Sequence, residues 1–398
     1  MSEWKEYKLG EFIKVKHGFA FKGDYIVSDK TDKILVTPGN FHIGGGFKSD
    51  KFKYYKSEDF PQDYILKDGD IVVTMTDLSK DSDTLGYSAI IPFSKSKKYL
   101  HNQRIGLVQF ISDKVCPNFV YWLLRTKEYQ SYIVGSASGT TIMHTSPSRI
   151  ENYSCLFPPL DEQRRIAAIL SALDDKIDLL RRENSTLEQM AETMFKELVK
   201  DKDNDGTLEQ IIFVQNGYAF KSKDFNETGE HKVIKIKNIS GRVVDIDTTD
   251  YVDNSVIMDV SSKFKINSGD VLIAMTGAEI GKLGIIPHTD KSLWLNQRVG
   301  LLSEKFNGSK YLAYLQLKSD YGQDYIENTA TGSAQPNISG NGIERCGFPI
   351  LKQEDILQIS NQVGEIYDKI VFNLGQINLL KDTRDFLLPK LMNNEIIL

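Results

Sequence analysis

The sequence repeats one set of short motifs, and this internal repeat constrains the fold more than any other feature. The segment HNQRIGL at His101–Leu107 returns as LNQRVGL at Leu295–Leu301. Two earlier motifs also return in the same order: VKHGFAFK (Val15–Lys22) as VQNGYAFK (Val214–Lys221), and GDIVVTMT (Gly69–Thr76) as GDVLIAMT (Gly269–Thr276). The spacing drifts slightly, as expected when loops change length while secondary-structure elements persist. The chain is therefore a tandem duplication of a whole domain.

A long heptad pattern follows each copy. Apolar residues recur at alternating steps of four and three from Ile166 to Leu198, which predicts a helix over about residues 161–200. The same register runs from Ile359 to Leu391, and Pro389 is expected to end this second helix. Two such helices pack most simply on each other, and a pseudo-two-fold relation between the halves makes them antiparallel. The apolar seam positions are Ile166, Leu170, Leu173, Ile177, Leu180, Leu187, Ile359, Val363, Ile366, Ile370, Ile377 and Leu380.

Two asparagines, Asn184 and Asn373, interrupt this seam. A polar residue at a core position often fixes the register of a helix pair at some cost in stability. The alternative is that both side chains reach solvent at the surface of the pair.

The segments between the helices contain short apolar strands and one stretch with helical spacing. DIVVTM, RIGLVQFI, KVIKIKNI and DVLIAM are predicted strands, and VYWLLRTKEYQSYI is a predicted helix. The fold class is therefore α/β (α+β): two tandem mixed domains alternate with two long helices that form an antiparallel coiled coil. The predicted boundaries are 1–157 and 204–349 for the two domains, and 158–203 and 350–398 for the helical regions.

Composition places the chain among ordinary globular proteins, with 398 residues of which 40% are hydrophobic and 26% charged. It has no run of apolar residues that could cross a membrane and no apolar signal segment at its start. Its three scattered cysteines do not suit a disulfide framework, so we expect a cytoplasmic protein. The net charge is −5, so any DNA binding must use a local basic face.

One segment carries a family resemblance. The stretch FPPLDEQRRIAAILSALDDKIDLL and the closing FLLPKLMNNEI resemble the conserved regions of specificity subunits of type I restriction-modification systems. The second copy of the motif, FPILKQEDI, is degraded, although YDKI at Tyr367–Ile370 is retained. The residues that fit the family pattern PPLxEQxxIAxxLxxLDxKI are Pro158, Pro159, Leu160, Glu162, Gln163, Ile166, Ala167, Leu170, Leu173, Asp174, Lys176 and Ile177.

The resemblance implies a non-catalytic DNA-recognition subunit. Each domain would bind one half of a bipartite, asymmetric double-stranded DNA target, and the helices would dock two methyltransferase subunits and set the half-site spacing. Restriction subunits would join through the complex. S-adenosylmethionine would then bind the methyltransferase, and ATP and magnesium the nuclease subunit, so no cofactor is expected in this chain. The alternatives are a subunit of a methylation-only system and a duplicated protein scaffold that does not bind DNA.

The sequence offers little support for an enzyme that acts alone. TGAEIGKLG (Thr276–Gly284) resembles a phosphate-binding loop, but its glycines are too close together and Leu283 occupies the Ser/Thr position. HIGGGFK (His42–Lys48) lacks the strand and helix that flank a dinucleotide-binding loop. There is no HExxH motif and no cluster of histidines at metal-ligand spacing.

Candidate DNA contacts are polar and basic residues on glycine-rich or polar loops, where they could reach base edges or phosphates. The shared NQR motif is a poor discriminator of two half-sites, because both copies carry it. It is expected to make either a common phosphate contact or a buried structural hydrogen bond, and we favour the second. The candidates are Lys22, Asn40, His42, Lys48, Lys80, Arg104, Thr140, Thr141 and His144 in the first domain. In the second they are Lys221, Asn238, Arg242, Lys282, Arg298, Ser333, Gln335 and Asn337.

Overall fold

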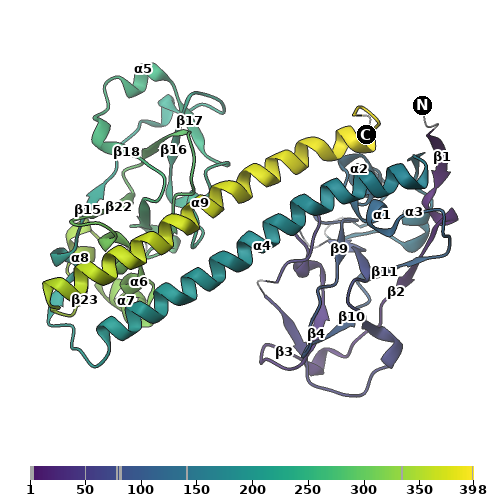
Figure 1. Ribbon diagram of the computed structural model, residues 1–398, viewed down its shortest axis with the longest axis horizontal. Helices are drawn as coiled ribbons and strands as arrows, with labels where there is room; N and C mark the ends of the chain where they lie inside the picture. The colour runs from purple at the N-terminus through teal and green to yellow at the C-terminus, as the bar shows by residue number, and fades with distance from the viewer. Residues whose placement is uncertain are drawn as a thin grey trace. The chain divides into compact units, whose positions relative to one another are not determined.

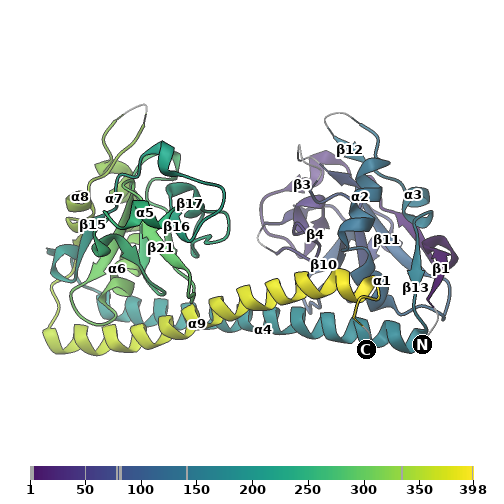
Figure 2. The same cartoon turned by 90° about the horizontal axis from the view of Figure 1, so that it is seen from above.

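Two helices of 40 residues each dominate the structure. The structure is a computed structural model, and it describes residues 4–49, 51–77, 79, 83–139, 142–332, 335–396 and 398. Helices α4 (Leu160–Val199) and α9 (Gln353–Met392) run antiparallel and pack side by side (Figures 1 and 2), which confirms the predicted pairing. The expectation that Pro389 ends the second helix is wrong. A proline in the last turn removes only one helical hydrogen bond, and α9 continues to Met392.

The chain forms two compact units, and each contains one globular domain with parts of both long helices. Unit 1 comprises Met1–Asp175 and Lys381–Leu398, and unit 2 comprises Lys176–Leu380. The domain boundaries predicted from the sequence treat the helices as separate regions, whereas the packing divides each helix between the two units.

The domain of unit 1 contains two main sheets. The first has the order β2 (Ile13–His17), β11 (Ile105–Phe110), β7 (Ile71–Thr74), β9 (Ser88–Ile90) and is antiparallel. The second has the order β3 (Ile26–Val27), β5 (Lys53–Tyr55), β4 (Lys33–Val36), β10 (Lys98–His101), β6 (Ile65–Leu66), with β4 and β10 parallel. Two small pairs complete the strands: β1 (Lys5–Lys8) with β13 (Ser154–Phe157), and β8 (Thr76–Asp77) with β12 (Met143–His144).

Strand alternation decides which layer each side chain joins. Ile71 and Val73 of β7 point to the cluster that also contains α1 (Pro117–Leu123), α2 (Lys127–Gly135) and α3 (Pro147–Glu151). Val72, between them, points to the second sheet, because successive strand residues face opposite sides. The stretch predicted as one helix is two, since the Thr126 hydroxyl accepts the Tyr129 N–H and begins α2 anew.

Unit 2 repeats this architecture. Its two sheets have the orders β15 (Ile212–Asn216), β22 (Val299–Glu304), β19 (Val271–Ala274), β20 (Leu283–Ile285) and β17 (Asp250–Val252), β16 (His231–Ile234), β21 (Ser292–Leu295), β18 (Lys265–Ile266). The remaining elements are β14 (Gly206–Thr207), β23 (Gly347–Phe348), α5 (Asn254–Ile257), α6 (Ser309–Lys318), α7 (Asp320–Thr329) and α8 (Gly340–Glu344). The predicted strand KVIKIKNI ends early, because Ile236–Asn238 form a 3₁₀ helix.

The centre of the helix seam forms a small apolar cluster separate from the domain cores. Ile177, Leu180, Ile377 and Leu380 form a cluster that contains helix residues alone. Other seam positions pack into the domain cores: Ile166 and Leu170 in unit 1, and Leu187, Ile359, Val363, Ile366 and Ile370 in unit 2. Each long helix is thus both a partner of the other helix and part of a domain core.

The two seam asparagines face each other. Asn373 Nδ2 donates to Asn184 Oδ1 at 2.9 Å, and both side chains are buried. The alternative that they reach solvent is therefore wrong.

Candidate nucleic-acid interface

Four loops of unit 1 are joined by main-chain hydrogen bonds around the turn that carries the NQR motif. Phe19 N donates to His101 O at 2.8 Å, and Gln103 N donates back to Phe19 O at 2.9 Å. Met75 N donates to Arg104 O at 2.9 Å, and Thr145 N donates to Met75 O at 3.0 Å. This turn, which is the loop after β10, is therefore bonded to the loops after β2 and β7, and the loop after β12 joins them through Met75.

Unit 2 makes the same four bonds with its own copy. Tyr218 N donates to Leu295 O (2.8 Å), Gln297 N to Tyr218 O (2.9 Å), Met275 N to Arg298 O (3.1 Å) and Ile338 N to Met275 O (3.0 Å). We call these the loop clusters of unit 1 (residues 17–22, 75–77, 101–104 and 138–139 with 142–146) and unit 2 (216–221, 275–282, 295–298 and 331–332 with 335–338). The duplication has preserved a scaffold that holds several loops together.

A glycine in each first loop permits the close approach. A Cβ on Gly18 would lie 2.1 Å from Asn102 O, and a Cβ on Gly217 would lie 2.2 Å from Asn296 O. Both distances are far below a van der Waals contact, so only glycine fits here.

The glutamine and arginine side chains of both NQR motifs lie at the surface, not in the domain interior. Gln103, Arg104, Gln297 and Arg298 are exposed, so the prediction of a buried side-chain hydrogen bond is wrong for them. Their main chain makes the structural bonds instead. Neither arginine side chain has an ion-pair or hydrogen-bond partner among the described residues. Two exposed guanidinium groups thus lie on equivalent hydrogen-bonded turns.

The hairpins beside these turns differ between the units. Ser138 and His144 exchange main-chain bonds of 3.0 and 2.8 Å, as Thr331 and Asn337 do at 2.9 Å, so His144 and Asn337 are equivalent and both exposed. Gln335 is exposed on the second hairpin. The candidate residues thus include chemically different side chains on equivalent scaffolds.

One basic residue of this cluster was missed. Arg149 of α3 donates to His144 O at 3.2 Å and to Ser138 Oγ at 3.4 Å. Its only sequence signal was its place a few residues after the polar loop, in SPSRI.

Five other candidates lie on the domain surfaces. Lys22 forms an exposed ion pair with Asp59 at 3.5 Å, Lys282 pairs with Glu279, and Lys221 is exposed. His42 and Lys48 line an open groove of about 550 Å³, which also contains the carboxylates of Asp77 and Asp83. The groove is partly acidic, which does not favour it as a phosphate site.

Two candidates are placed where the prediction does not hold. Asn40 and Asn238 are buried: each Oδ1 accepts a main-chain N–H, from Thr37 at 2.9 Å and from Lys235 at 3.0 Å, so neither reaches a base edge. Arg242 pairs with Glu188 of α4 at 3.3 Å but its side chain is exposed, so its DNA contact stays a prediction. Lys80, Thr140, Thr141 and Ser333 lie outside the described residues.

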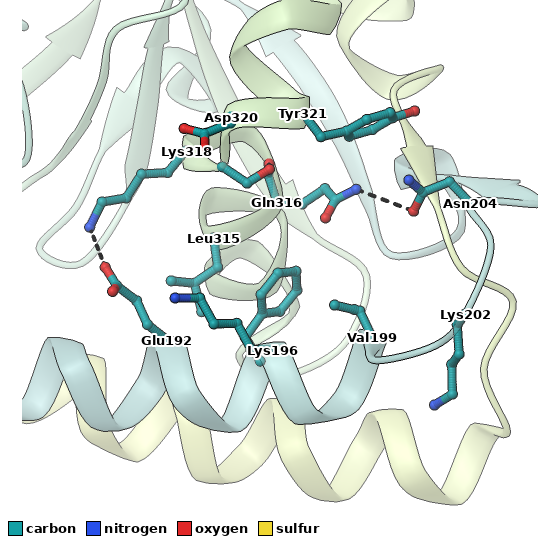
Figure 3. Close-up of a pocket in the computed structure, with 12 residues that line it drawn as sticks. Glu192, Lys196, Val199, Lys202, Asn204, Leu315, Gln316, Lys318, Asp320 and Tyr321 are labelled. Atoms are coloured by element: carbon teal, nitrogen blue, oxygen red, sulfur yellow. Dashed lines mark hydrogen bonds and ion pairs between the residues drawn. The ribbon is translucent and has the colours of Figure 1, made fainter.

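Unit 2 has a hollow of its own (Figure 3), and no residue of the loop cluster lines it. It has a volume of about 430 Å³ and is lined by the last turns of α4 and by α6 and the start of α7. Lys318 crosses it to Glu192 of α4 at 2.8 Å, and Gln316 Nε2 lies 3.5 Å from Asn204 Oδ1. These bonds fasten the domain to the helix. Within the described ranges there is no His, Cys, Asp and Glu group suited to a metal ion, and no helix with the length and hydrophobicity to cross a membrane.

A buried histidine lies directly under the unit 1 turn. His101 Nε2 donates to Ile105 O at 2.8 Å, and burial lowers the pKa of His101 from 6.5 to about 4. The unfolded chain therefore binds a proton below pH 6.5 that the folded domain excludes. Stability is complete above pH 6.5 and falls as the pH is lowered toward 4, by about 3 kcal/mol at most.

We expect His101→Leu to remove this pH dependence, since leucine occupies the equivalent position 295. Urea unfolding of unit 1 at pH 7 and pH 4.5 would measure it. The exposed His288→Gln in unit 2 is the control and should retain the wild-type slope. An unchanged slope in His101→Leu would refute the assignment.

Comparison with known proteins identifies the architecture. The family described as "Type I restriction modification DNA specificity domain" matches residues 1–189 and 201–371. The chain belongs to this family. The specificity subunit thus carries two matches, one for each copy of the repeat.

Curated relatives extend over most of its length. The specificity subunit of the type I restriction enzyme MjaVIII from Methanocaldococcus jannaschii is 25% identical over 360 residues, which cover 84% of this chain and 79% of the relative. That of HindI from Haemophilus influenzae is 23% identical and covers 100% of both chains. The crystal structure of the type I S subunit from M. genitalium has the same fold, with a TM-score of 0.61, 17% identity and coverage of 98% and 96%.

Proposed function

We propose that each domain of this specificity subunit reads one half of a bipartite DNA target through its loop cluster. The observation that carries the proposal is the duplicated scaffold: the same four main-chain hydrogen bonds hold loops whose exposed side chains differ. A bipartite asymmetric target requires two readers with the same geometry and different base contacts. A duplicated protein scaffold would have no such need for matched loops with unmatched side chains.

The shared arginines are assigned to the DNA backbone. Arg104 and Arg298 occupy equivalent turns, so they supply the same contact in both half-sites, which suits a phosphate better than a base. The hairpin residues are assigned to base edges: His144 in one unit, and Gln335 and Asn337 in the other. Amide side chains form paired hydrogen bonds with adenine, so the second half-site is expected to contain one.

The long helices are proposed to dock methyltransferase subunits, and restriction subunits through them. Large apolar side chains are exposed along both helices, and those of α9 recur every seven residues, so they form an apolar stripe of the kind that docks a partner. These side chains are Ile169, Leu179 and Met190 on α4, and Phe372, Leu379 and Phe386 on α9. Catalysis would belong to the partners, with S-adenosylmethionine in the methyltransferase and ATP and magnesium in the nuclease. A methylation-only system would use the same surfaces without the nuclease.

The test is to map methylated adenines in the genome of a host that expresses this chain with its cognate methyltransferase. We expect one split motif that disappears when the chain is deleted. Exchange of residues 1–157 for those of another family member should change one half of the motif and leave the other half intact. Methylation that persists unchanged after the deletion would favour the scaffold alternative.

The phosphate assignment makes a separate prediction. Arg104→Gln and Arg298→Gln should each weaken binding to cognate and unrelated duplexes alike, and should reduce the slope of log K against log salt by about 1. Arg104→Lys and Arg298→Lys keep the charge and should keep most of the slope. The measurement is fluorescence anisotropy of the complex with methyltransferase at several salt concentrations. A loss confined to the cognate duplex would instead assign these arginines to bases.

A further inference from the structure

The central seam of the two long helices is asymmetric. Both helices have 40 residues, and the repeat places Leu160 of α4 in register with Gln353 of α9. In this register Leu180 corresponds to Asn373, and Asn184 corresponds to Ile377. The two helices therefore carry their asparagine at different positions of the same repeat.

The antiparallel arrangement brings like residues together. Asn184 faces Asn373 across a 2.9 Å hydrogen bond, and Leu180 shares an apolar cluster with Ile377. The repeat relates these two contacts, because Asn184 corresponds to Ile377 and Asn373 corresponds to Leu180. The asparagine contact is polar on both helices and the Leu180–Ile377 contact is apolar on both helices, so each of these four residues meets a partner of its own kind.

Pairing of two identical helices would break this match. If α4 met the α4 of a second copy in the same way, Asn184 would face Leu180 twice. If α9 met another α9, Asn373 would face Ile377 twice. Each mismatch buries an amide without a hydrogen-bond partner, and such groups are costly. We infer that the asparagine pair selects α4–α9 pairing within one chain against pairing of like helices between two copies.

A second contact, in unit 1, has the same asymmetry. Asp174 of α4 pairs with Arg384 of α9 at 2.6 Å. The corresponding residues are Tyr367 and Ala191, which belong to the core of unit 2. Two α4 helices would therefore place Asp174 opposite Ala191 and lose the ion pair.

Other contacts do not discriminate in this way. Lys369 pairs with Glu183 at 3.6 Å, but Lys176 corresponds to Lys369, so two α4 helices could form the same pair.

Discrimination is needed because α4 is synthesised before α9, with the second domain between them, and its apolar seam could meet another copy first.

The asparagine pair is not a means of maximising stability. Asn373 Oδ1 is buried and has no hydrogen-bond partner in the part of the chain that the structure describes, so an aliphatic pair would pack at lower cost. The full-length variant Asn184→Leu with Asn373→Ile is therefore expected to melt at or above the wild-type temperature. Two differently tagged copies of it, co-expressed, should also capture each other at least fivefold more than two wild-type copies. Unchanged capture would overturn the inference.

A second set of full-length variants separates pairing from local packing. Leu180→Asn with Asn184→Leu keeps the composition but moves the asparagine of α4 by four residues, about one helical turn. Each seam asparagine then faces an aliphatic residue within the chain, as it would in a pair of like helices. We expect its melting temperature to fall by about 4–10 °C.

Addition of Asn373→Ile and Ile377→Asn restores the match at the other position and should recover most of the loss. If the fourfold variant is as unstable as the mismatched one, or the mismatched one melts as wild type does, the inference fails.

Discussion

Replacement of Asp174 by asparagine is expected to lower the free energy of unfolding of unit 1 by about 3 kcal/mol. Asp174 forms ion pairs with two arginines, Arg125 of the domain and Arg384 of α9. Each guanidinium Nη1 lies 2.6 Å from a carboxylate oxygen of Asp174. Arg125 is only 4% exposed and also donates to Gly44 O at 2.8 Å and to the Tyr121 hydroxyl at 2.6 Å. The asparagine variant leaves this buried guanidinium without a counter-charge, which costs more than the ion pair itself contributes.

Urea unfolding followed by near-ultraviolet circular dichroism would measure the loss of unfolding free energy. Trp122 reports on this site because its ring lies 4.2 Å from the Arg125 guanidinium. Asp178→Asn is the matched control on the same helix. Asp178 pairs with Arg181 at 3.0 Å, but both side chains are exposed, so its loss should change stability by less than about 0.5 kcal/mol. Equal effects of the two substitutions would contradict the stabilising role assigned to Asp174.

The same carboxylate predicts a sensitivity to strong acid. Burial raises the pKa of Asp174, but Arg125 and Arg384 outweigh it and hold the pKa below 3.8. The stabilisation is therefore complete above pH 3.8 and is lost as the pH falls below that value. This range is distinct from that of His101, so Asp174→Asn and His101→Leu should flatten different parts of the stability curve.

Replacement of Gly18 by alanine is expected to destabilise unit 1 by about 2–3 kcal/mol and to displace its loop cluster. The added Cβ would meet Asn102 O at 2.1 Å and His101 O at 2.6 Å, and neither backbone atom can move without breaking the bonds of the NQR turn. Gly217→Ala should act in the same way on unit 2, where the nearest atom is Asn296 O at 2.2 Å.

Mapping of methylated adenines would give the functional result. Gly18→Ala should relax recognition of one half of the motif and Gly217→Ala the other half. Gly23→Ala is the control, because its Cβ would meet none of the described residues within 4 Å, and stability should change by less than about 0.5 kcal/mol. If each glycine variant affected both halves equally, the assignment of one domain to each half-site would be wrong.

Candidate contacts were predictable only in part. The sequence placed Arg104 and Arg298 on equivalent turns because the NQR motif occurs twice, but it could not tell a buried side chain from an exposed one. Asn40 and Asn238 had the composition of reading loops, yet both fold inward to satisfy a main-chain N–H of a 3₁₀ turn. Arg149 was overlooked because only the fold of α3 brings it to the hairpin.

The sequence by itself determined the duplication, the two long helices and the position of the asparagines in the seam. These features are encoded in local periodicity and in repeated motifs, which persist whatever the rest of the chain does. Only the tertiary structure decided that Asn184 meets Asn373, that Asp174 joins Arg125 to Arg384, and that the main chain of each NQR turn organises four loops. Those contacts join residues far apart in sequence, and their geometry depends on how several elements pack at once.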